Sequence, residues 1–574
     1  MIRSLTAVFL FLPLIAADPW TQLDDSVHAA LRWRGGSPAA AIAEHQRWRT
    51  VLDTPKLRAA ISELLDAAAA KNPEFSAFFT GATQRGFSLA DLQSVGAHEM
   101  GASLTLSSVA GSVQPCIGAW ATVADPLWQR LLGLVQEQVD AKRVTRQDLV
   151  RDGRTIITLQ HKNGIWAILR EDSGLIWVQG LPGKDPEVIV NRLMGWYAGI
   201  SKGATFVQRA SEAKVIGQSA SDTLFEGIVN ARAVIDVLEQ HAPPQAKMML
   251  PILDAMFGLD ALGLAGIEAG VTQQQTTVCS SLQTTGRRQG LLHIADSAPK
   301  PVAAPAWIPA DALSASQFNL DLPGLIDALR TAAAGNPMFK NQFTSMENAV
   351  PALAGGLSLQ QIATAIGGTF WFVELPEPTD ALLTGDDRKA FVFALADPAV
   401  VTRLLPLFNM AARGREVRFV TEQGAQGVRF AANPTMKSPE LGVFIGAHQL
   451  VVGIGSNVAS EVLAAIARGD GAWARTPYAE RGLKQLPTQP LLHWSVEDSS
   501  SMLRRLPDAL SHLLNTLSDS TDDAGLDKAL DHLQAALPDG ETLASTMAGP
   551  STVATYDDAG VIRVIQIQNP AMDN

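Results

Sequence analysis

One pattern in this sequence occurs twice at a constant spacing, and it constrains the fold more than any other feature. An apolar run leads into Asp125-Pro126, and a series of strand-like segments then ends at Gly180. A second apolar run leads into Asp397-Pro398, and a second series ends at Gly453. The two Asp-Pro steps lie 272 residues apart and the two glycines 273. A spacing kept over so many residues predicts one module present in tandem.

Shorter matches extend the repeat towards the N-terminus of each copy. Asn72-Pro73 corresponds to Asn336-Pro337, and in both the proline ends a helical pattern. Ser88 corresponds to Ser358, and each serine precedes a short helical segment that its hydroxyl can cap.

Length supports two modules, because single hydrophobic cores stop growing near ~250–300 residues and this chain has 574. We predict a signal peptide at residues 1–17, a first α+β module at 18–296, a proline-rich linker at 297–309 and a second α+β module at 310–574. Hydrophobic residues make up 47% of the chain and charged residues 18%, which is typical of globular proteins.

Turn signals predict the sheet of each module. Asp152-Gly153, Asn163-Gly164 and Asp172-Ser173-Gly174 recur about every ten residues between β-rich segments, which is typical of an antiparallel meander. Asp125 and Asp397 have side chains suited to an N-cap, and each is followed by a proline suited to the first helical position. The fold class is therefore α+β, with two similar meander sheets and helices packed on one face of each.

The N-terminus has the pattern of a secretory leader. Arg3 precedes an apolar run from Leu5 to Ile15, and the small residues Ala16-Ala17 follow. A buried N-terminal strand is the alternative. We predict a periplasmic or secreted protein with no transmembrane segment after leader removal, since no later apolar run is long enough. A net charge of −12 argues against nucleic-acid partners.

The two cysteines, Cys116 and Cys279, both lie in strand-like segments of the first module. Arg388 and Ala554 stand at the corresponding places of the second, so the cysteines are absent together there. In an oxidising compartment this joint absence favours a candidate disulfide between Cys116 and Cys279. Two buried free thiols are the alternative.

Two tryptophans flanked by arginines are the candidate ligand contacts. Arg32-Trp33-Arg34 recurs as Arg47-Trp48-Arg49, 15 residues later. Trp33, Arg34, Trp48 and Arg49 could stack on a ligand or hold an acidic group. Alternatively, each tryptophan packs inward and its arginines lie on the surface.

No motif in the sequence indicates catalysis, a cofactor or a metal. Val451–Ser456 resembles a dinucleotide-binding turn, but Val458 occupies the third glycine position. The histidines lack metal-ligand spacing, and no serine elbow is present. The acidic segment Asp519–Asp527 misses the spacing of a calcium loop.

The Asp-Pro steps, the meanders and the leader together resemble an uncharacterised family of exported bacterial proteins with tandem α+β repeats. That resemblance implies an α+β fold and no site residues. We expect a non-catalytic binding or scaffolding protein outside the cytoplasm, with an apolar ligand or a protein partner. The alternative is an extracytoplasmic hydrolase whose site is assembled from distant residues.

Overall fold

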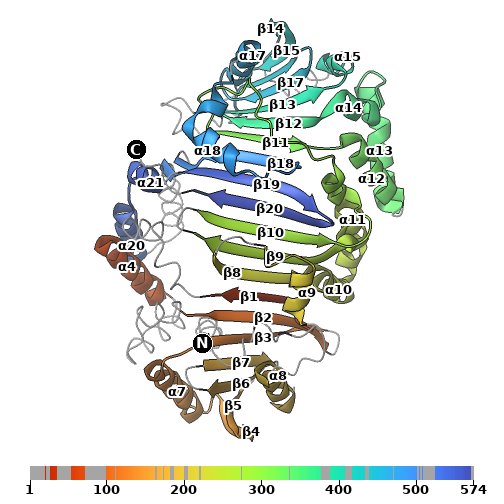
Figure 1. Cartoon of the computed structure of the whole chain (residues 1–574). Coiled ribbons are helices and arrows are strands. Elements are labelled where there is room, and N and C mark those ends of the chain that lie inside the picture. Colours follow the sequence, from red (N-terminus) through yellow and green to blue (C-terminus); the bar gives the residue numbers. More distant parts are fainter. Residues whose placement is uncertain are drawn as a thin grey trace. The chain divides into compact units, whose positions relative to one another are not determined.

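The structure is a computed structural model of the 574-residue chain (Figure 1). It describes residues 20, 23, 26–34, 54–71, 98–109, 112–161, 164–171, 174–180, 186–198, 205–218, 222–272, 275–334, 337–376, 388–406, 416–432, 438–469, 471–500, 503–504, 507, 524–547 and 549–569. The predicted leader, Trp48, Arg49, Asn72-Pro73 and Ser88 lie outside these residues.

The chain forms two compact units, and each is assembled from several segments. Unit 1 comprises residues 1–242, 263–283 and 502–547, and unit 2 comprises residues 243–262, 284–501 and 548–574. Both helices and a large antiparallel sheet are present, which agrees with the predicted α+β class. The proline-rich segment 297–309 belongs to unit 2, where Trp307 and Ile308 are buried in the core.

Among the described residues of unit 1, ten antiparallel strands form the sheet. They are β1 (Ala29–Trp33), β2 (Met100–Val109), β3 (Ser112–Thr122), β4 (Thr145–Arg151), β5 (Arg154–His161), β6 (Gly164–Glu171), β7 (Gly174–Gly180), β8 (Asp222–Asn230), β9 (Leu262–Val271) and β10 (Thr276–Thr284). Neighbouring strands pair in the order β4, β5, β6, β7, β3, β2, β1, β8, β9, β10. The predicted meander is the run from β4 to β7.

In the described part of unit 2, ten further antiparallel strands form the sheet. They are β11 (Ser314–Asn319), β12 (Ile366–Glu374), β13 (Lys389–Leu395), β14 (Val417–Glu422), β15 (Ala425–Phe430), β16 (Leu441–Ile445), β17 (Gln449–Ile454), β18 (His493–Asp498), β19 (Pro550–Asp558) and β20 (Val561–Gln568). They pair in the order β14, β15, β16, β17, β13, β12, β11, β18, β19, β20. Counted along the chain, this is the order of unit 1.

The helices follow the same division into units. Unit 1 holds α4 (Pro55–Lys71), α7 (Asp125–Asp140), α8 (Pro186–Ala198), α9 (Phe206–Glu212), α10 (Ala231–His241), α20 (Ala524–Ala536) and α21 (Gly540–Met547). Unit 2 holds α11 (Pro244–Phe257), α12 (Leu322–Ala334), α13 (Pro337–Leu353), α14 (Leu359–Ala365), α15 (Pro398–Thr402), α17 (Val458–Arg468), α18 (Pro477–Gln485) and the 3₁₀ helices η2 (Leu259–Ala261), η3 (Gly290–Asp296) and η5 (Trp473–Arg475).

Each unit contains a helix that comes from the other half of the sequence. In unit 1, α20 packs on α4, and Leu57, Ala60 and Ala536 form a small core between them. In unit 2, α11 packs on α12, where Ile252 and Ala255 meet Ala332 and Ala333. These contacts explain why the units are not continuous in sequence.

Turn chemistry explains the meanders of both units. Asp152 and Gly153 have φ of 49° and 76°, the left-handed pair that a two-residue hairpin requires. Gln423 and Gly424, with φ of 50° and 78°, form the corresponding turn of unit 2. Glycine at the second position has no Cβ to oppose this conformation.

The two predicted aspartate caps have different outcomes. Asp397 accepts hydrogen bonds from the backbone N–H of Ala399 and Val400 at 3.0 and 3.2 Å, as predicted. Asp125 forms no capping bond, because Ala124 is the N-cap and the Asp125 carboxylate pairs with Arg170 instead. The prediction was therefore wrong for Asp125. Ser358 forms the predicted cap in a reciprocal arrangement with Gln361.

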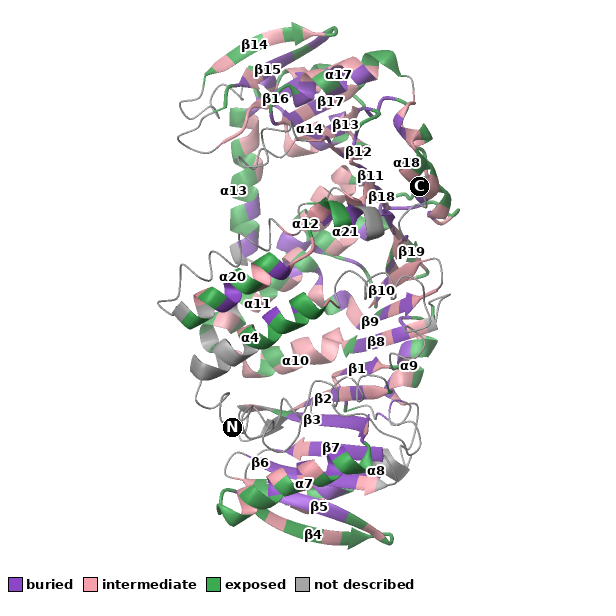
Figure 2. Cartoon of the chain, turned by 90° about the vertical axis from the view of Figure 1, so that its left-hand side faces the viewer, coloured by how far each residue is buried: buried purple, intermediate pink, exposed green. Residues whose placement is uncertain are grey.

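Helices cover both faces of the meander in unit 2. Residues of α17 pack with Phe444 and Val451 on one face, whereas Val401 of α15 packs with Val443 on the other. Adjacent residues of a strand point to opposite faces, so these are two separate cores. The prediction of helices on one face alone is wrong for this meander. The edge strands β4 and β14 are largely exposed, while β5 and β7 are largely buried (Figure 2).

The candidate disulfide is absent from the structure. Cys116 and Cys279 are both free and buried. Cys116 lies on β3 and Cys279 on β10, and four strands separate β3 from β10 in the pairing order. Neighbouring strands lie about 4.8 Å apart, whereas a disulfide needs Cα atoms within about 7 Å. The distance between β3 and β10 is therefore too large for the predicted disulfide, and that prediction is wrong.

Across the described segments, none of the helices combines the length and the apolar character needed to cross a membrane.

Candidate functional site

Unit 1 has a sheet face on which large apolar side chains remain accessible to solvent. On β1, Ala29, Leu31 and Trp33 point to this face, while Ala30 and Arg32 point to the buried one. Neighbouring strands continue the pattern in register. We define the apolar face of unit 1 as Ala29, Leu31, Trp33, Met100, Ala102, Leu104, Phe225, Gly227, Val229, Ala265, Ile267 and Ala269.

Three aliphatic side chains at the centre of this face are unusually exposed. Leu31, Val229 and Ile267 are 49%, 40% and 39% exposed, respectively. They lie on β1, β8 and β9, which are adjacent interior strands of the sheet. Leu31 and Ile267 both lie opposite Gly227, and Ile267 packs over it, because a Cβ added to Gly227 would lie 2.9 Å from Cγ2 of Ile267. Contiguous apolar exposure of this kind marks interaction sites.

The opposite face of the same strands carries a partly buried ion-pair cluster. Arg34 donates from Nε and Nη2 to the two carboxylate oxygens of Glu226 at 3.0 and 3.1 Å. Arg32 pairs with Glu99 at 2.9 Å and lies 3.7 Å from Glu226. The Glu226 side chain is only 5% exposed, and Arg32 and Arg34 offset the cost of burying it.

Strand β1 therefore places Trp33 and Arg34, the two candidate ligand contacts that the structure describes, on opposite faces of the sheet. Trp33 lies on the apolar face between Phe225 and Met100, where a ligand could reach it. Arg34 points to the other face and is bound to Glu226. The contact role of Trp33, Arg34, Trp48 and Arg49 stays a prediction.

The corresponding face of unit 2 is lined by aromatic rings. His493, Phe318, Phe370 and Phe393 lie side by side on β18, β11, β12 and β13, and we call them the aromatic row. Their ring centroids are 4.2, 4.6 and 5.3 Å apart in that order, and every pair is stacked. All four side chains are partly exposed.

The side chains on this face become more polar with distance from the aromatic row along the strands. The next row holds Ser316 and Ser495, whose hydroxyls are hydrogen-bonded at 2.9 Å, beside Phe372 and Phe391. The row after it holds Glu497, Ser314, Glu374 and Lys389. Burial, with Glu374 and Asp498 nearby, raises the pKa of Glu497.

Burial also controls the charge of His493. It lowers the pKa of this imidazole to about 4, so the ring is neutral near pH 7. Nδ1 lies 3.4 Å from the hydroxyl oxygen of Thr555.

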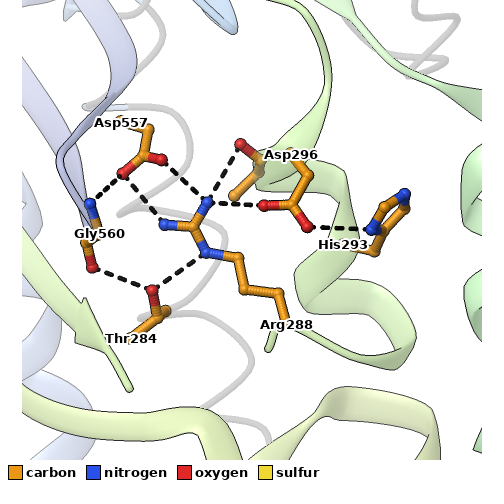
Figure 3. Close-up of polar contacts among 7 residues, drawn as sticks. Thr284, Arg288, His293, Asp296, Asp557 and Gly560 are labelled. Atoms are coloured by element: carbon orange, nitrogen blue, oxygen red, sulfur yellow. Dashed lines mark hydrogen bonds and ion pairs between the residues drawn. The ribbon is translucent and has the colours of Figure 1, made fainter. Parts of the chain in front are cut away.

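Unit 2 also contains a cluster of polar side chains around Arg288 (Figure 3). Its guanidinium donates to both carboxylate oxygens of Asp557 at 2.9 and 3.0 Å, to Asp296 at 2.9 Å and to the Thr284 hydroxyl at 3.0 Å. The Arg288 side chain is 7% exposed. These hydrogen bonds raise the pKa of Arg288 and lower that of Asp557.

Next to this cluster a pocket of about 320 Å³ opens beside α12, lined in part by Arg287, His293, Asp321 and Asp327. Asp296 holds Nδ1 of His293 at 3.0 Å, which directs Nε2 away from Asp296. A Cβ on Gly324 would lie 2.9 Å from that Nε2 and 2.1 Å from Oδ2 of Asp321, so glycine leaves room for both groups. The arrangement can move a proton or hold a small polar group.

Sequence reasoning missed both features of unit 2. Asp557 lies 269 residues from Arg288, and no local motif connects Arg288 with Asp296 or Asp557. The phenylalanines alternate in Phe370–Phe372 and Phe391–Phe393, which was a readable sign of one aromatic sheet face. Within the described segments, no three histidine, cysteine or carboxylate side chains are placed to hold a metal ion.

No protein-family model matches the chain, and none of the curated proteins is similar to it. Among solved structures, the chain is similar to crystal form I of TP0453, with 7% identity and a TM-score of 0.24 over 50% of this chain and 89% of that one. Crystal form III gives 8% and 0.25 over 50% and 90%, and crystal form IV gives 10% and 0.23 over 47% and 81%. At these values the likeness carries no argument about fold or function.

Proposed function

We propose that this protein is a non-catalytic extracytoplasmic binding protein that holds an extended apolar ligand, such as an acyl chain, on the apolar face of unit 1. The observation that carries the proposal is the exposure of Leu31, Val229 and Ile267 on three adjacent interior strands. Such strands normally bury their aliphatic side chains, so this face is suited to a ligand that completes its burial.

The energetics fit a small ligand. Fully burying a side chain of this size contributes about 1.5–3 kcal/mol, and these three retain 39–49% of their exposure. Covering them would therefore contribute on the order of 1 kcal/mol each. With the less exposed Trp33, Phe225 and Met100 alongside, the face would contribute about 4–6 kcal/mol. Each ligand methylene buried on it would add about 0.8 kcal/mol, and the cost of association is set against this sum.

Duplication of an ancestral module is part of the proposal. It is supported by the spacing of the Asp-Pro steps and by the identical strand order of the two sheets. The predicted modules, 18–296 and 310–574, would each supply one sheet. An extracytoplasmic location is supported by the leader pattern from Arg3 to Ala17.

The test is native purification of the full chain, followed by solvent extraction and mass spectrometry. Recovery of a stoichiometric acyl lipid is the expected result. Ile267→Asp should abolish that recovery, because a carboxylate in the centre of the face repels a hydrocarbon chain. Val150→Asp is the matched control, since Val150 is 69% exposed on the edge strand β4 of the same unit. An empty wild-type protein that captures one protein partner through this face would replace ligand binding with scaffolding.

The second candidate, an extracytoplasmic hydrolase, is favoured by one observation. Asp296 orients His293 at the rim of the pocket in unit 2, as a carboxylate orients a general base. Two nearby hydroxyls already have backbone partners: Ser297 accepts from the N–H of Asp321, and Thr331 donates to the carbonyl of Asp327. In this candidate the nucleophile would be a water molecule activated by His293. Hydrolysis of p-nitrophenyl esters that falls at least about 100-fold in His293→Gln would support this candidate.

A further inference from the structure

We propose that the aromatic row of unit 2 is a second binding site, which takes a neutral amphiphile with a ring and a hydroxyl, amine or carbonyl group. The inference deepens the proposed function and rests on it, because it assigns a different ligand class to the corresponding face of the other unit. Where unit 1 places Phe225, Trp33 and Met100 in one row, unit 2 places His493, Phe318 and Phe370.

The stacking geometry determines what the row presents to a ligand. Planes of successive rings differ by 25°, 6° and 26° from His493 to Phe393, so the rings face each other along the row. Their edges therefore point away from the sheet. Ring edges carry partial positive charge, whereas ring faces are negative. A ligand ring laid across these edges, or a carbonyl oxygen against them, is electrostatically complementary.

His493 adds a polar group to this apolar surface. Its Nδ1 faces Thr555, and no group in the described part of the chain pairs with its Nε2. A neutral imidazole nitrogen can accept a hydrogen bond from an amine or hydroxyl, or donate one to a carbonyl in the other tautomer. A hydroxyl, an arylamine and a carbonyl group are all uncharged near pH 7, which matches the neutral ring.

The charges nearby select against anionic ligands. Two rows along the same face, Glu374 and Glu497 flank Ser314 on its two neighbouring strands. Lys389 lies opposite Glu374 on β13, so the row carries two carboxylates and one ammonium group. Its net negative charge disfavours a fatty-acid carboxylate that lies along the strands from the aromatic row. The apolar face of unit 1 has no charged residue, so it lacks this discrimination. Charge complementarity thus assigns the neutral amphiphile to unit 2.

The experiment uses the full chain and two fluorescent probes, N-phenyl-1-naphthylamine, which is neutral and ring-bearing, and cis-parinarate, which is an anionic acyl chain. We expect both to bind wild type and neither to displace the other. Phe370→Ala should weaken binding of the naphthylamine at least about ten-fold and leave parinarate unchanged. Phe419→Ala is the control, because Phe419 is 55% exposed on the edge strand β14 of the same unit.

His493→Phe keeps a ring in the row and removes Nε2. It should weaken the naphthylamine about five-fold, the loss of one hydrogen bond, with the melting temperature at pH 7.5 showing that the variant is folded. Parinarate binding without naphthylamine binding would overturn this inference and leave the proposed function standing. Binding of neither probe would refute both. Equal effects of Phe370→Ala on both probes, or none on either, would also overturn the second site.

Discussion

Arg288 and Asp557 form a bidentate ion pair within unit 2, with nitrogen–oxygen distances of 2.9 and 3.0 Å. The two residues lie 269 positions apart in the sequence. Arg288 is almost completely buried, so Asp557 supplies much of the compensation for its charge. We predict that Asp557→Asn lowers the free energy of unfolding by about 1–3 kcal/mol, since Asp296 still pairs with Arg288. Urea-induced unfolding followed by tryptophan fluorescence measures the change.

The matched control is Glu480→Gln, which breaks a pair with Lys484 whose side chains are 56% and 72% exposed. Exposed pairs contribute about 0–1 kcal/mol, so this variant should unfold almost like wild type. Asp557 has a lowered pKa, so its stabilisation is present above the ordinary carboxyl value of about 3.9 and is lost as pH falls through the folded value. The difference in the free energy of unfolding between wild type and Asp557→Asn should persist from pH 8 to 5 and disappear in stronger acid. A difference that remains in strong acid would contradict the lowered pKa of Asp557.

His493 should make unit 2 sensitive to mild acid. Its pKa is about 4 in the fold, whereas an unfolded histidine titrates near 6.5. The unfolded chain therefore binds a proton first as pH falls, and stability is lost between about pH 6.5 and 4. The loss amounts to up to about 3 kcal/mol. Melting temperatures of wild type and His493→Phe, measured from pH 7.5 to 4.5, should converge or cross as pH falls. Parallel curves would mean that His493 titrates normally.

Two glycines in unit 1 should respond to alanine in opposite directions. A Cβ on Gly266 would lie 2.1 Å from the carbonyl oxygen of Val215, so Gly266→Ala should cost about 2 kcal/mol or more. Gly133 lies in helix α7 with nothing within 4 Å of an added Cβ, and Gly133→Ala should stabilise by about 0.5–1 kcal/mol. Thermal melting of both variants checks the pair. A tolerated Gly266→Ala would show that β9 and Val215 do not pack as described.

Both thiols should be free. Protein unfolded in denaturant without reductant should react with two equivalents of Ellman's reagent, because Cys116 and Cys279 lie on strands that are not neighbours. The native protein should react slowly, since both side chains are buried. Zero equivalents after unfolding would restore the disulfide inferred from the sequence.

Local chemistry was readable from the sequence. The Asp152-Gly153 turn, the Asp397 cap and the Ser358 cap depend on residues a few positions away, and each is present as predicted. Asp125 shows the limit of this reasoning. A side chain suited to capping also suits an ion pair, and Arg170 arrives from a strand 45 residues later.

Partners far apart in sequence were not predictable from one chain. Helical periodicity indicates that α20 has an apolar side, but nothing in residues 524–536 identifies α4 as the helix it covers. The Trp33 and Arg34 pair illustrates the same point at a single strand. The adjacent Trp33 and Arg34 suggested one joint ligand contact, whereas the alternation of side chains along β1 places them on opposite faces of the sheet.

The packing of α20 on α4 has a consequence for biosynthesis. Unit 1 begins near the N-terminus but includes residues 502–547, so a growing chain has made most of its length before the helix that covers Leu57 and Ala60 emerges. At ~5–20 residues per second, that interval is on the order of a minute. During it α4 carries an uncovered apolar side, and ribosome-bound chains that stop short of residue 524 should be the form that holdase chaperones engage.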